Sequence, residues 1–469
     1  MGWFQRTFKM DREAAAKESE ALFTPLKYNQ RRKPFQLYCT AFGWGFLMTG
    51  LAAGGTISYL GWKDAIMAII IGNLILVVIA GLCAIPGQQT GMGNSPVFKF
   101  AFGKLGYFFP AIILTVTVVC WQGATAGMLA STWAKGAVSG WTFVICAIIA
   151  SVVGLIMTYF GIGVIEKFAI VATFVILAVG IMSLAYCFIT AGGFEGFKAL
   201  ADKNADPQFN MYNGITQVVG AWVAGSIICT ELSRFSKTKG TAAGMMIIGL
   251  PVCQIFLNLL GYSGATVFGS HDFTLYLGQI GFWAYIVAII AMSFAILSSL
   301  DTNLYFPSAM FSFMANIPRK GGVVICGLAG LIIAALGLYA HYGAFLNVMG
   351  ILIPPLAGPV IAEFFIMSKG KGWDPKLLHK MPKVNIASIL GYLIGLAMRW
   401  ACPSAIPAEL WSLIFAIIGT VIVGMIFKAA GKPQGYEAVA ALAEEPILPQ
   451  LDDANLGDFE ANFIHYDNQ

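Results

Sequence analysis

At residues 220–226 the chain reads GAWVAGS, in the middle of an apolar run that extends from Gly214 to Cys229. A run of this length and composition is a candidate membrane span. Glycines at its centre let the backbone leave helical geometry, and a freed carbonyl or amide survives in a bilayer only where it lines a cavity or is buried in protein. Because Trp222 stands inside this weak segment, we interpret it as a broken helix that forms half of a substrate site. The alternative is a close helix–helix contact, since Ala221 and Gly225 have small-xxx-small spacing.

The composition assigns the whole chain to the membrane. Of its 469 residues, 58% are hydrophobic and only 11% are charged, whereas soluble domains carry about 25% charged residues. The nine cysteines stand singly, without CxxC or Cys/His spacing, so neither a zinc site nor a disulfide framework is predicted. No nucleophile–base pair or phosphate loop is visible. We therefore predict neither an enzyme, nor a cofactor, nor a nucleic-acid partner.

Twelve apolar runs follow a polar, basic lead of 34 residues that lacks the apolar core of a signal peptide. Each run reaches or approaches the roughly 20 residues that cross a bilayer core. An even number of spans places both termini on the same side of the membrane. The runs cover residues 35–60, 65–88, 106–133, 141–161, 163–190, 213–231, 241–268, 280–308, 321–340, 343–368, 384–401 and 406–428.

The distribution of positive charge predicts which side this is. With the N-terminus inside, 23 of the 28 Lys and Arg residues fall in inner segments, and the five outside are Lys63, Lys135, Lys198, Lys203 and Arg399. Cytoplasmic loops carry such an excess, so both termini are predicted to be cytoplasmic in a multi-pass protein of the cell membrane, in contact with its lipid. Beyond residue 432 the chain has eight acidic residues and no basic one, which we interpret as a flexible cytoplasmic tail.

The first span has a weak centre of its own, GLAAGGT at residues 50–56. The span with the same defect is the sixth, five spans later. Two glycine-interrupted spans in corresponding positions indicate a transporter of inverted five-helix repeats, with its site between the broken helices. The predicted organisation is a cytoplasmic segment at 1–34, repeat 1 at 35–190, an extracellular loop at 191–212, repeat 2 at 213–368, spans 11 and 12 with their preceding loop at 369–428, and the acidic tail at 429–469.

Polar groups inside the spans are few. Span 8 carries SSLDTN at residues 298–303, where the adjacent hydroxyls of Ser298 and Ser299 can supply hard oxygen ligands to a small cation. Asp301 is a carboxylate well inside a span, and a buried ionisable group is a functional hypothesis by default. The structural alternative is that the hydroxyls bond to their own helix and the carboxylate caps or pairs. Span 3 offers an aromatic face beside amide and hydroxyl groups, or simply a packed indole, at Trp121, Gln122 and Thr125.

Several ordered motifs between about residues 37 and 428 resemble the nucleobase–cation symporters, in the cytosine permease branch. Residues 229–239 resemble the T-A/E-x-x-R-F segment that follows span 6 in this family, and residues 301–305 its Asn-Asp-Asn-x-Leu-Tyr segment. Residues 353–365 resemble its I-P-P-x-x-G-x-x-I-A-D/E stretch, and residues 54–56 and 71–74 agree as well. The resemblance implies twelve spans, the leucine-transporter fold with helices 1 and 6 broken, and uptake of a nucleobase-like heterocycle with a cation.

The resemblance also implies site residues. The family holds its planar substrate between an aromatic residue on span 3 and one on span 6, and these positions resemble Trp121 and Trp222. Two aromatic faces can clamp a flat ring while polar groups fix its edge. The expected substrate-binding residues are thus Trp121, Gln122, Thr125, Trp222, Gly225, Asp301 and Asn303. The expected sodium ligands, from spans 1 and 8, are Leu47, Gly50, Ala295, Ser298 and Ser299.

Three positions depart from the cytosine permease pattern. A glutamine three residues before the span 3 aromatic is replaced by Val118, a serine two residues after the span 6 aromatic by Ala224, and an asparagine after the hydroxyl pair by Leu300. The polar specificity contacts therefore differ, while the aromatic clamp and the cation ligands are kept.

We predict a secondary active symporter that imports a nucleobase or related planar heterocycle with a sodium ion. A proton is the alternative coupling ion. A transporter of the same fold for another small solute such as an amine is a second hypothesis, because Asp301 beside an aromatic pair suits a cation. A passive channel or facilitator is a third, and an integral-membrane enzyme is the least supported.

Overall fold

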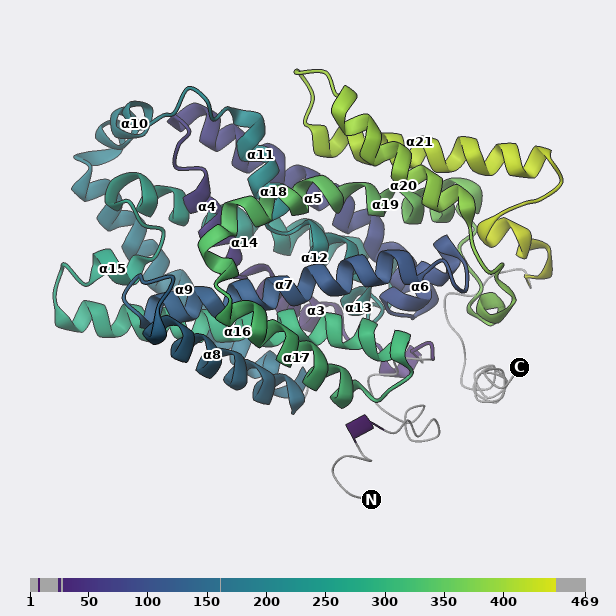
Figure 1. The fold of residues 1–469 in the computed structure, drawn as a ribbon, viewed down its shortest axis with the longest axis horizontal. Helices are drawn as coiled ribbons and strands as arrows, with labels where there is room; N and C mark the ends of the chain where they lie inside the picture. Colours follow the sequence, from purple (N-terminus) through teal and green to yellow (C-terminus); the bar gives the residue numbers. More distant parts are fainter. Residues whose placement is uncertain (1–6, 9–23, 27, 161, 444–469) are drawn as a thin grey trace.

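The computed structural model describes residues 7–8, 24–26, 28–160 and 162–443, and within these it is entirely helical apart from turns and connections (Figure 1). By length and composition, seven of the described helices could each cross a membrane, and up to ten spans result when each bent helix pair counts as one. Helices are found at all twelve predicted positions. The prediction of an all-α, multi-span membrane protein is confirmed.

The first half begins with a span in two pieces. Span 1 consists of α3 (Pro34–Gly45) and α4 (Thr49–Thr56), whose axes differ by 44°. The next four spans are α5 (Trp62–Thr90), α7 (Phe108–Trp133), α8 (Trp141–Tyr159) and α9 (Ile162–Thr190), with the short α6 (Asn94–Phe102) between spans 2 and 3.

The second half repeats this pattern. Span 6 is divided into α11 (Met211–Gly220), α12 (Val223–Ile228) and α13 (Thr230–Ser233), with a bend of 46° between the pieces before and after residues 221–222. It is followed by α14 (Lys239–Phe268), the short α15 (Phe273–Leu277), α16 (Phe282–Ala315) and α17 (Arg319–Ala335). Span 10 consists of α18 (Tyr342–Leu352), α19 (Pro354–Ile361) and a π-helical turn, η3 (Ala362–Met367), and the last two spans are α20 (Ile386–Met398) and α21 (Ala408–Ala429).

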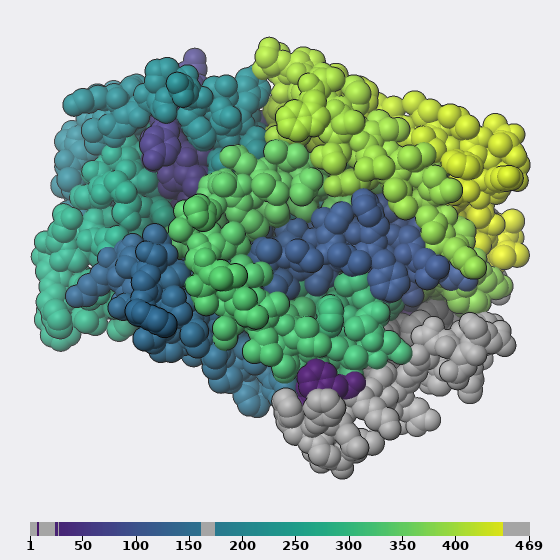
Figure 2. Space-filling model, viewed as in Figure 1, coloured from purple at the N-terminus to yellow at the C-terminus, as the bar shows by residue number. Residues whose placement is uncertain are grey.

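The two broken spans lie in the middle of the bundle. The pieces of span 1 pack on α14, and those of span 6 pack on α5, while α7 packs along α16. Figure 1 shows α7 crossing the centre of the molecule with α12 beside it, and α20 and α21 together at one edge. In Figure 2 the surface of α6 and α7 (blue) lies between that of α16–α17 (green) and that of α19–α20 (light green).

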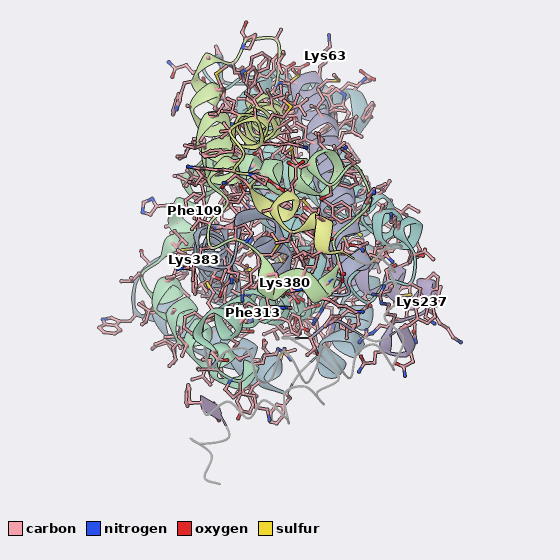
Figure 3. All side chains as sticks on the ribbon, turned by 90° about the vertical axis from the view of Figure 1, so that its right-hand side faces the viewer. Lys63, Phe109, Lys237, Phe313, Lys380 and Lys383 are labelled. Carbon is pink, nitrogen blue, oxygen red and sulfur yellow. The ribbon has the colours of Figure 1, made fainter. Side chains whose placement is uncertain are left out.

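Segments predicted on the same side of the membrane contact one another. At one end, the Leu26 backbone N–H donates to the Gly91 carbonyl and that of Lys104 to the Pro382 carbonyl. At the other end, the Asp206 N–H donates to the Tyr59 carbonyl, and the Asn204 amide to the Thr266 carbonyl. The side assignment is therefore self-consistent. Figure 3 looks at the first of these ends and labels three lysines from predicted inner segments, Lys237, Lys380 and Lys383.

Two predicted connections are more ordered than expected. The segment predicted as an extracellular loop contains the helix α10 (Gly193–Lys203), because Phe197 and Ala201, one turn apart, are buried there and the Phe197 ring meets Trp62 edge-on. The predicted flexible tail is also packed up to residue 443. Tyr436 is buried and its hydroxyl accepts a hydrogen bond from the Asp374 N–H, so an apolar side chain within the acidic sequence anchors this part. The remainder of the predicted tail lies outside the described residues.

Candidate substrate and cation sites

The break in span 6 is a close backbone contact followed by an aromatic residue. A Cβ on Gly220 would lie 2.2 Å from the Leu346 carbonyl oxygen of α18, so only glycine permits this approach. Trp222 then has φ −142° and ψ 0° and begins the next piece, with the Ser226 N–H donating to its carbonyl. A Cβ on Gly225 would lie 3.0 Å from the Trp222 ring, so this glycine lets the indole lie over the start of α12.

The break in span 1 is bridged by side chains from other helices. The Gln254 Nε2 of α14 donates to the Gly45 carbonyl at 2.6 Å, and the Asn258 Nδ2, one turn along the same helix, donates to the Gly50 carbonyl at 2.9 Å. From α16, the Ser299 hydroxyl accepts a hydrogen bond of 3.1 Å from the Met48 N–H. Backbone groups freed at membrane depth require such partners, which explains how this helix can be broken there.

A small cavity lies between the two breaks. Pockets for small ligands are lined mainly by apolar and aromatic side chains with a few polar groups. The walls come from spans 1, 3, 6 and 8, and the lining residues are Trp44, Leu47, Val118, Trp121, Ala221, Trp222, Ala224, Gly225, Ile228, Asn303 and Phe306. The structure thus brings Trp121, Trp222, Gly225 and Asn303 of the predicted substrate residues to one cavity.

Three indoles surround this cavity. The ring centroids of Trp44 and Trp222 are 4.5 Å apart at an interplanar angle of 52°, and Trp44 also lies 4.9 Å from the Phe306 ring. Trp121 approaches from span 3 and meets Phe345 of α18 edge-on at 5.2 Å. The cavity therefore offers aromatic faces from three different spans to a flat molecule.

The predicted cation ligands gather beside the break in span 1. The Ser299 hydroxyl that accepts from Met48 also donates to the Ala295 carbonyl at 3.1 Å, and the Gly50 N–H donates to the Leu47 carbonyl at 3.0 Å. The bond from Met48 thus brings the Ser299 hydroxyl of span 8 to the break in span 1. The carbonyl of Gly50, another predicted ligand, accepts its bond from Asn258 of α14. The Ser298 carbonyl instead accepts from Thr302 of its own helix, and Ser298 is buried beside Ser299. Whether these groups bind sodium stays a prediction.

Three predicted substrate residues do not line the cavity. Gln122 lies between α8 and α17, since a Cβ on Gly154 or Gly330 would meet its side chain at 3.5 Å and 2.8 Å. Asp301 is two residues from Asn303, a rotation of about 200° around a helix, and the Thr158 hydroxyl of α8 donates to its carbonyl. Thr125 is fully buried behind Asn303, whose Nδ2 donates to its hydroxyl at 3.0 Å. The geometry does not favour direct substrate contact by these three residues.

Sequence reasoning did not assign a role to Trp44, Phe306, Gln254 or Asn258. Trp44 had one available signal, because it is a tryptophan at membrane depth, far from either predicted interface. Gln254 and Asn258 also carried a signal, because they are two amides at i, i+4 spacing inside an apolar span. Burying such amides at membrane depth costs free energy unless they bind other buried polar groups. Phe306 had none, because a phenylalanine in a span is ordinarily a packing residue.

Two inverted sets of spans, each with a broken first helix, and a cavity between the breaks define a secondary transporter of the leucine-transporter type. A family model described as "permease for cytosine/purines, uracil, thiamine, allantoin" matches residues 31–416. The chain belongs to this family, the nucleobase–cation symporters, in agreement with the resemblance of its motifs. It is accordingly a membrane permease and not an enzyme.

Relatives support the same placement. The cytosine permease of Escherichia coli (strain K12) is 25% identical over 390 residues, which are 82% of this chain and 90% of the relative. The hydantoin permease of Microbacterium maritypicum is 22% identical over 414 residues, covering 81% and 83%.

Solved structures agree on the fold. Mhp1, a nucleobase-cation-symport-1 family transporter in a closed conformation with bromovinylhydantoin bound, superposes with a TM-score of 0.76 at 19% identity, covering 91% of this chain and 97% of that one. A Na+-coupled sialic acid symporter in an outward-open state has a TM-score of 0.64 at 13% identity, covering 90% and 95%.

Proposed function

We propose that this protein is a symporter that imports a neutral, planar nitrogen heterocycle of the nucleobase kind together with a sodium ion. The observation that carries the proposal is the cavity wall. It presents three indole rings and one amide, and none of the described residues that line it is charged. A flat, uncharged ring with a polar edge matches such a wall, because aromatic faces stack on it and the amide binds its edge.

The same wall disfavours the amine hypothesis. A primary ammonium group has three N–H donors, and at membrane depth these require a carboxylate or several oxygen acceptors nearby. Asp301, the carboxylate considered for this role, does not line the cavity. The relatives are in keeping with this, since they are named for cytosine and hydantoin, both neutral heterocycles.

Sodium coupling is supported by the oxygen groups at the break in span 1. Small hard cations prefer oxygen ligands, and the Ser299 hydroxyl, the Ala295 carbonyl and the backbone at 47–50 lie together there. A cation between them would hold span 1 against span 8. Leu47 lines the cavity as well, so binding of the cation and of the heterocycle would act on the same short segment.

A proton is the second candidate for the coupling ion. Asp301 is fully buried, and one of its carboxylate oxygens, Oδ2, has no hydrogen-bond partner in the described part of the chain. A carboxyl group in this position can carry a proton across the membrane if it is exposed to each side in turn. Sodium coupling and proton coupling predict different results in the same assay.

The test measures thermal unfolding of the full-length protein in detergent, with cytosine, uracil, hydantoin and hypoxanthine as probes, in sodium chloride and in choline chloride. A ligand that binds only the folded protein raises its stability. We expect a heterocycle whose stabilising effect grows with sodium and disappears in Trp222→Ala and in Ser298→Ala. Trp400→Ala, on an indole that is 80% exposed, is the matched control.

Other outcomes would contradict parts of the proposal. Stabilisation by an amine instead of these probes would contradict the substrate class. Stabilisation that is independent of sodium but depends on pH would favour the proton as the coupling ion, provided that the pH dependence is lost in Asp301→Asn. In proteoliposomes, equilibration of the heterocycle without accumulation under a sodium gradient would indicate a passive facilitator.

A further inference from the structure

Asn303 has a chemical function that no other residue on the cavity wall shares. Indole side chains donate hydrogen bonds but cannot accept them, whereas a side-chain amide does both. Among the described residues that line the cavity, Asn303 is the only one whose side chain contains an acceptor. The orientation of its amide therefore decides whether a side chain of the wall can accept a hydrogen bond from a substrate.

Thr125 determines that orientation. Its hydroxyl has one proton, and the Trp121 carbonyl lies 2.8 Å from the oxygen, in the position to accept it. Because the hydroxyl donates this proton to the Trp121 carbonyl, its oxygen can act only as an acceptor toward the Asn303 side chain, 3.0 Å away. The Asn303 atom beside Thr125 must then be the Nδ2 group, and the Oδ1 atom is the one left for the cavity.

The reversed amide is unfavourable for a physical reason. If Oδ1 faced Thr125, the hydroxyl would have to give its proton to Asn303. Two oxygen lone pairs, on Thr125 and on the Trp121 carbonyl, would then oppose each other at 2.8 Å in a fully buried place. This contact is repulsive, and the low dielectric of a buried place strengthens the repulsion, so the arrangement with Nδ2 beside Thr125 is favoured.

Trp222, another residue of the cavity lining, has a hydrogen-bond donor that is unused in the described part of the chain. The Trp222 Nε1–H is buried and has no hydrogen-bond partner among the described residues. A ring that carries N–H next to C=O can donate to Asn303 and accept from an indole. This pair of groups is the edge of a cyclic amide or imide.

We propose that Thr125 is a positioning residue that fixes the Asn303 amide with its oxygen toward the cavity, so that the transporter selects heterocycles with a ring N–H at that edge. This inference rests on the proposed function and specifies its substrate class as cyclic amides and imides. It also replaces the expectation that Thr125 binds substrate directly.

The experiment compares N–H and N-methyl forms of the same probes. Dissociation constants of hydantoin, uracil, cytosine and hypoxanthine, and of their singly N-methylated analogues, are measured by calorimetry on the full-length protein in detergent with sodium. For a probe that binds the wild type, methylation of one particular ring nitrogen should weaken binding by about 10- to 100-fold, as expected for a buried acceptor left without its partner.

The variants separate positioning from simple structural damage. Thr125→Ser keeps the hydroxyl and should keep the discrimination, whereas Thr125→Val and Thr125→Ala should bind the N–H form more weakly and reduce the discrimination to less than about threefold. Thr115→Val is the matched control, because Thr115 is buried on the same helix and its hydroxyl has no hydrogen-bond partner among the described residues.

Each result bears on the inference. Full discrimination in folded Thr125→Val and Thr125→Ala, or equal binding of N–H and N-methyl forms by the wild type, would overturn it and leave the proposed function standing. Absence of binding by any of the four probes to the wild type would contradict the proposed function itself, and the inference with it.

Discussion

The two helix breaks differ in the contacts that stabilise their non-helical backbone. At the break in span 1, side chains of neighbouring helices bind the freed backbone groups: Gln254 and Asn258 from α14, and Ser299 from α16. At the break in span 6, the described contacts of Trp222 are a backbone turn and a tilted contact with the Trp44 ring. The break in span 1 is bound by polar side chains of neighbouring helices, whereas the break in span 6 carries an aromatic residue that lines the cavity.

This difference separates two tasks. The backbone and hydroxyl oxygens at the break in span 1 suit a cation, because small hard cations prefer oxygen ligands. An aromatic break at span 6 suits a flat organic ring. Variants at the first break should therefore change stability and the response to sodium, and variants at the second should change heterocycle binding.

The largest effect is expected from Gly261→Ala in α14. A Cβ there would lie 1.9 Å from the Leu51 carbonyl of α4, so α4 would have to move off α14. We expect a loss of about 3 kcal/mol or more in folding stability, at the upper end for overpacking. Gly81→Ala in α5, whose Cβ would meet Ile247 at an ordinary 3.6 Å, is the control and should be nearly neutral. Equal melting temperatures for the two variants would contradict the close contact.

At the other break, Trp222→Ala should weaken heterocycle binding by about 10- to 100-fold, from the 1–3 kcal/mol that a stacked base loses on alanine substitution. The protein should remain folded, and its thermal response to sodium alone should persist. Isothermal calorimetry with the heterocycle found in the screen measures the first effect. Loss of the sodium response as well would show that the two breaks are not separate in function.

Asn258→Leu tests the external support of span 1. The variant leaves the Gly50 carbonyl and the Asn73 amide without a hydrogen-bond partner from α14. We expect a loss of about 1–3 kcal/mol in stability and a weaker response to sodium, read from thermal unfolding at several sodium concentrations. Gln208→Leu, at an exposed amide, is the control. An unchanged melting temperature would mean that this break needs no support from α14.

The smallest effect is expected from Ser299→Ala, which removes one hydroxyl and its bond of 3.1 Å to Met48. A single hydrogen bond contributes about 1 kcal/mol, so the apparent affinity for sodium should fall about fivefold. Ser308→Ala, further along the same helix, should have no such effect, because within the described part of the chain that hydroxyl bonds to the Tyr305 carbonyl of its own turn. A sodium response that is the same in both variants would remove Ser299 from the set of ligands.

The sequence predicted much of the site, because the helix breaks and the aromatic wall follow from the chemistry of neighbouring residues. Glycines at 220 and 225 with a tryptophan between them predict a break and an aromatic wall, and the structure places Trp222 and Trp121 at one cavity. Hydropathy predicted the positions of the twelve spans for the same reason: a bilayer requires about 20 apolar residues in a row.

The sequence did not predict which side of a helix faces the cavity. Asp301 and Asn303 are two residues apart in an apolar span, and only packing against α8 and α7 decides that Asn303 meets the cavity and Asp301 does not. The same holds for Gln122, which is adjacent to Trp121 in the sequence but lies between α8 and α17. Apolar spans have weak sequence periodicity, because the lipid-facing and protein-facing sides are both apolar.

The sequence by itself determined that this chain is a multi-span helical protein, where its spans lie, and which two of them break. These features follow from the cost of exposing polar backbone to lipid, which acts on each segment separately. The tertiary structure alone decided that α14 supports the break in span 1, that Trp44 joins the two expected indoles, and that Thr125 orients Asn303. Each of these depends on contacts between residues far apart in the chain, and only the packing of one helix on another selects them.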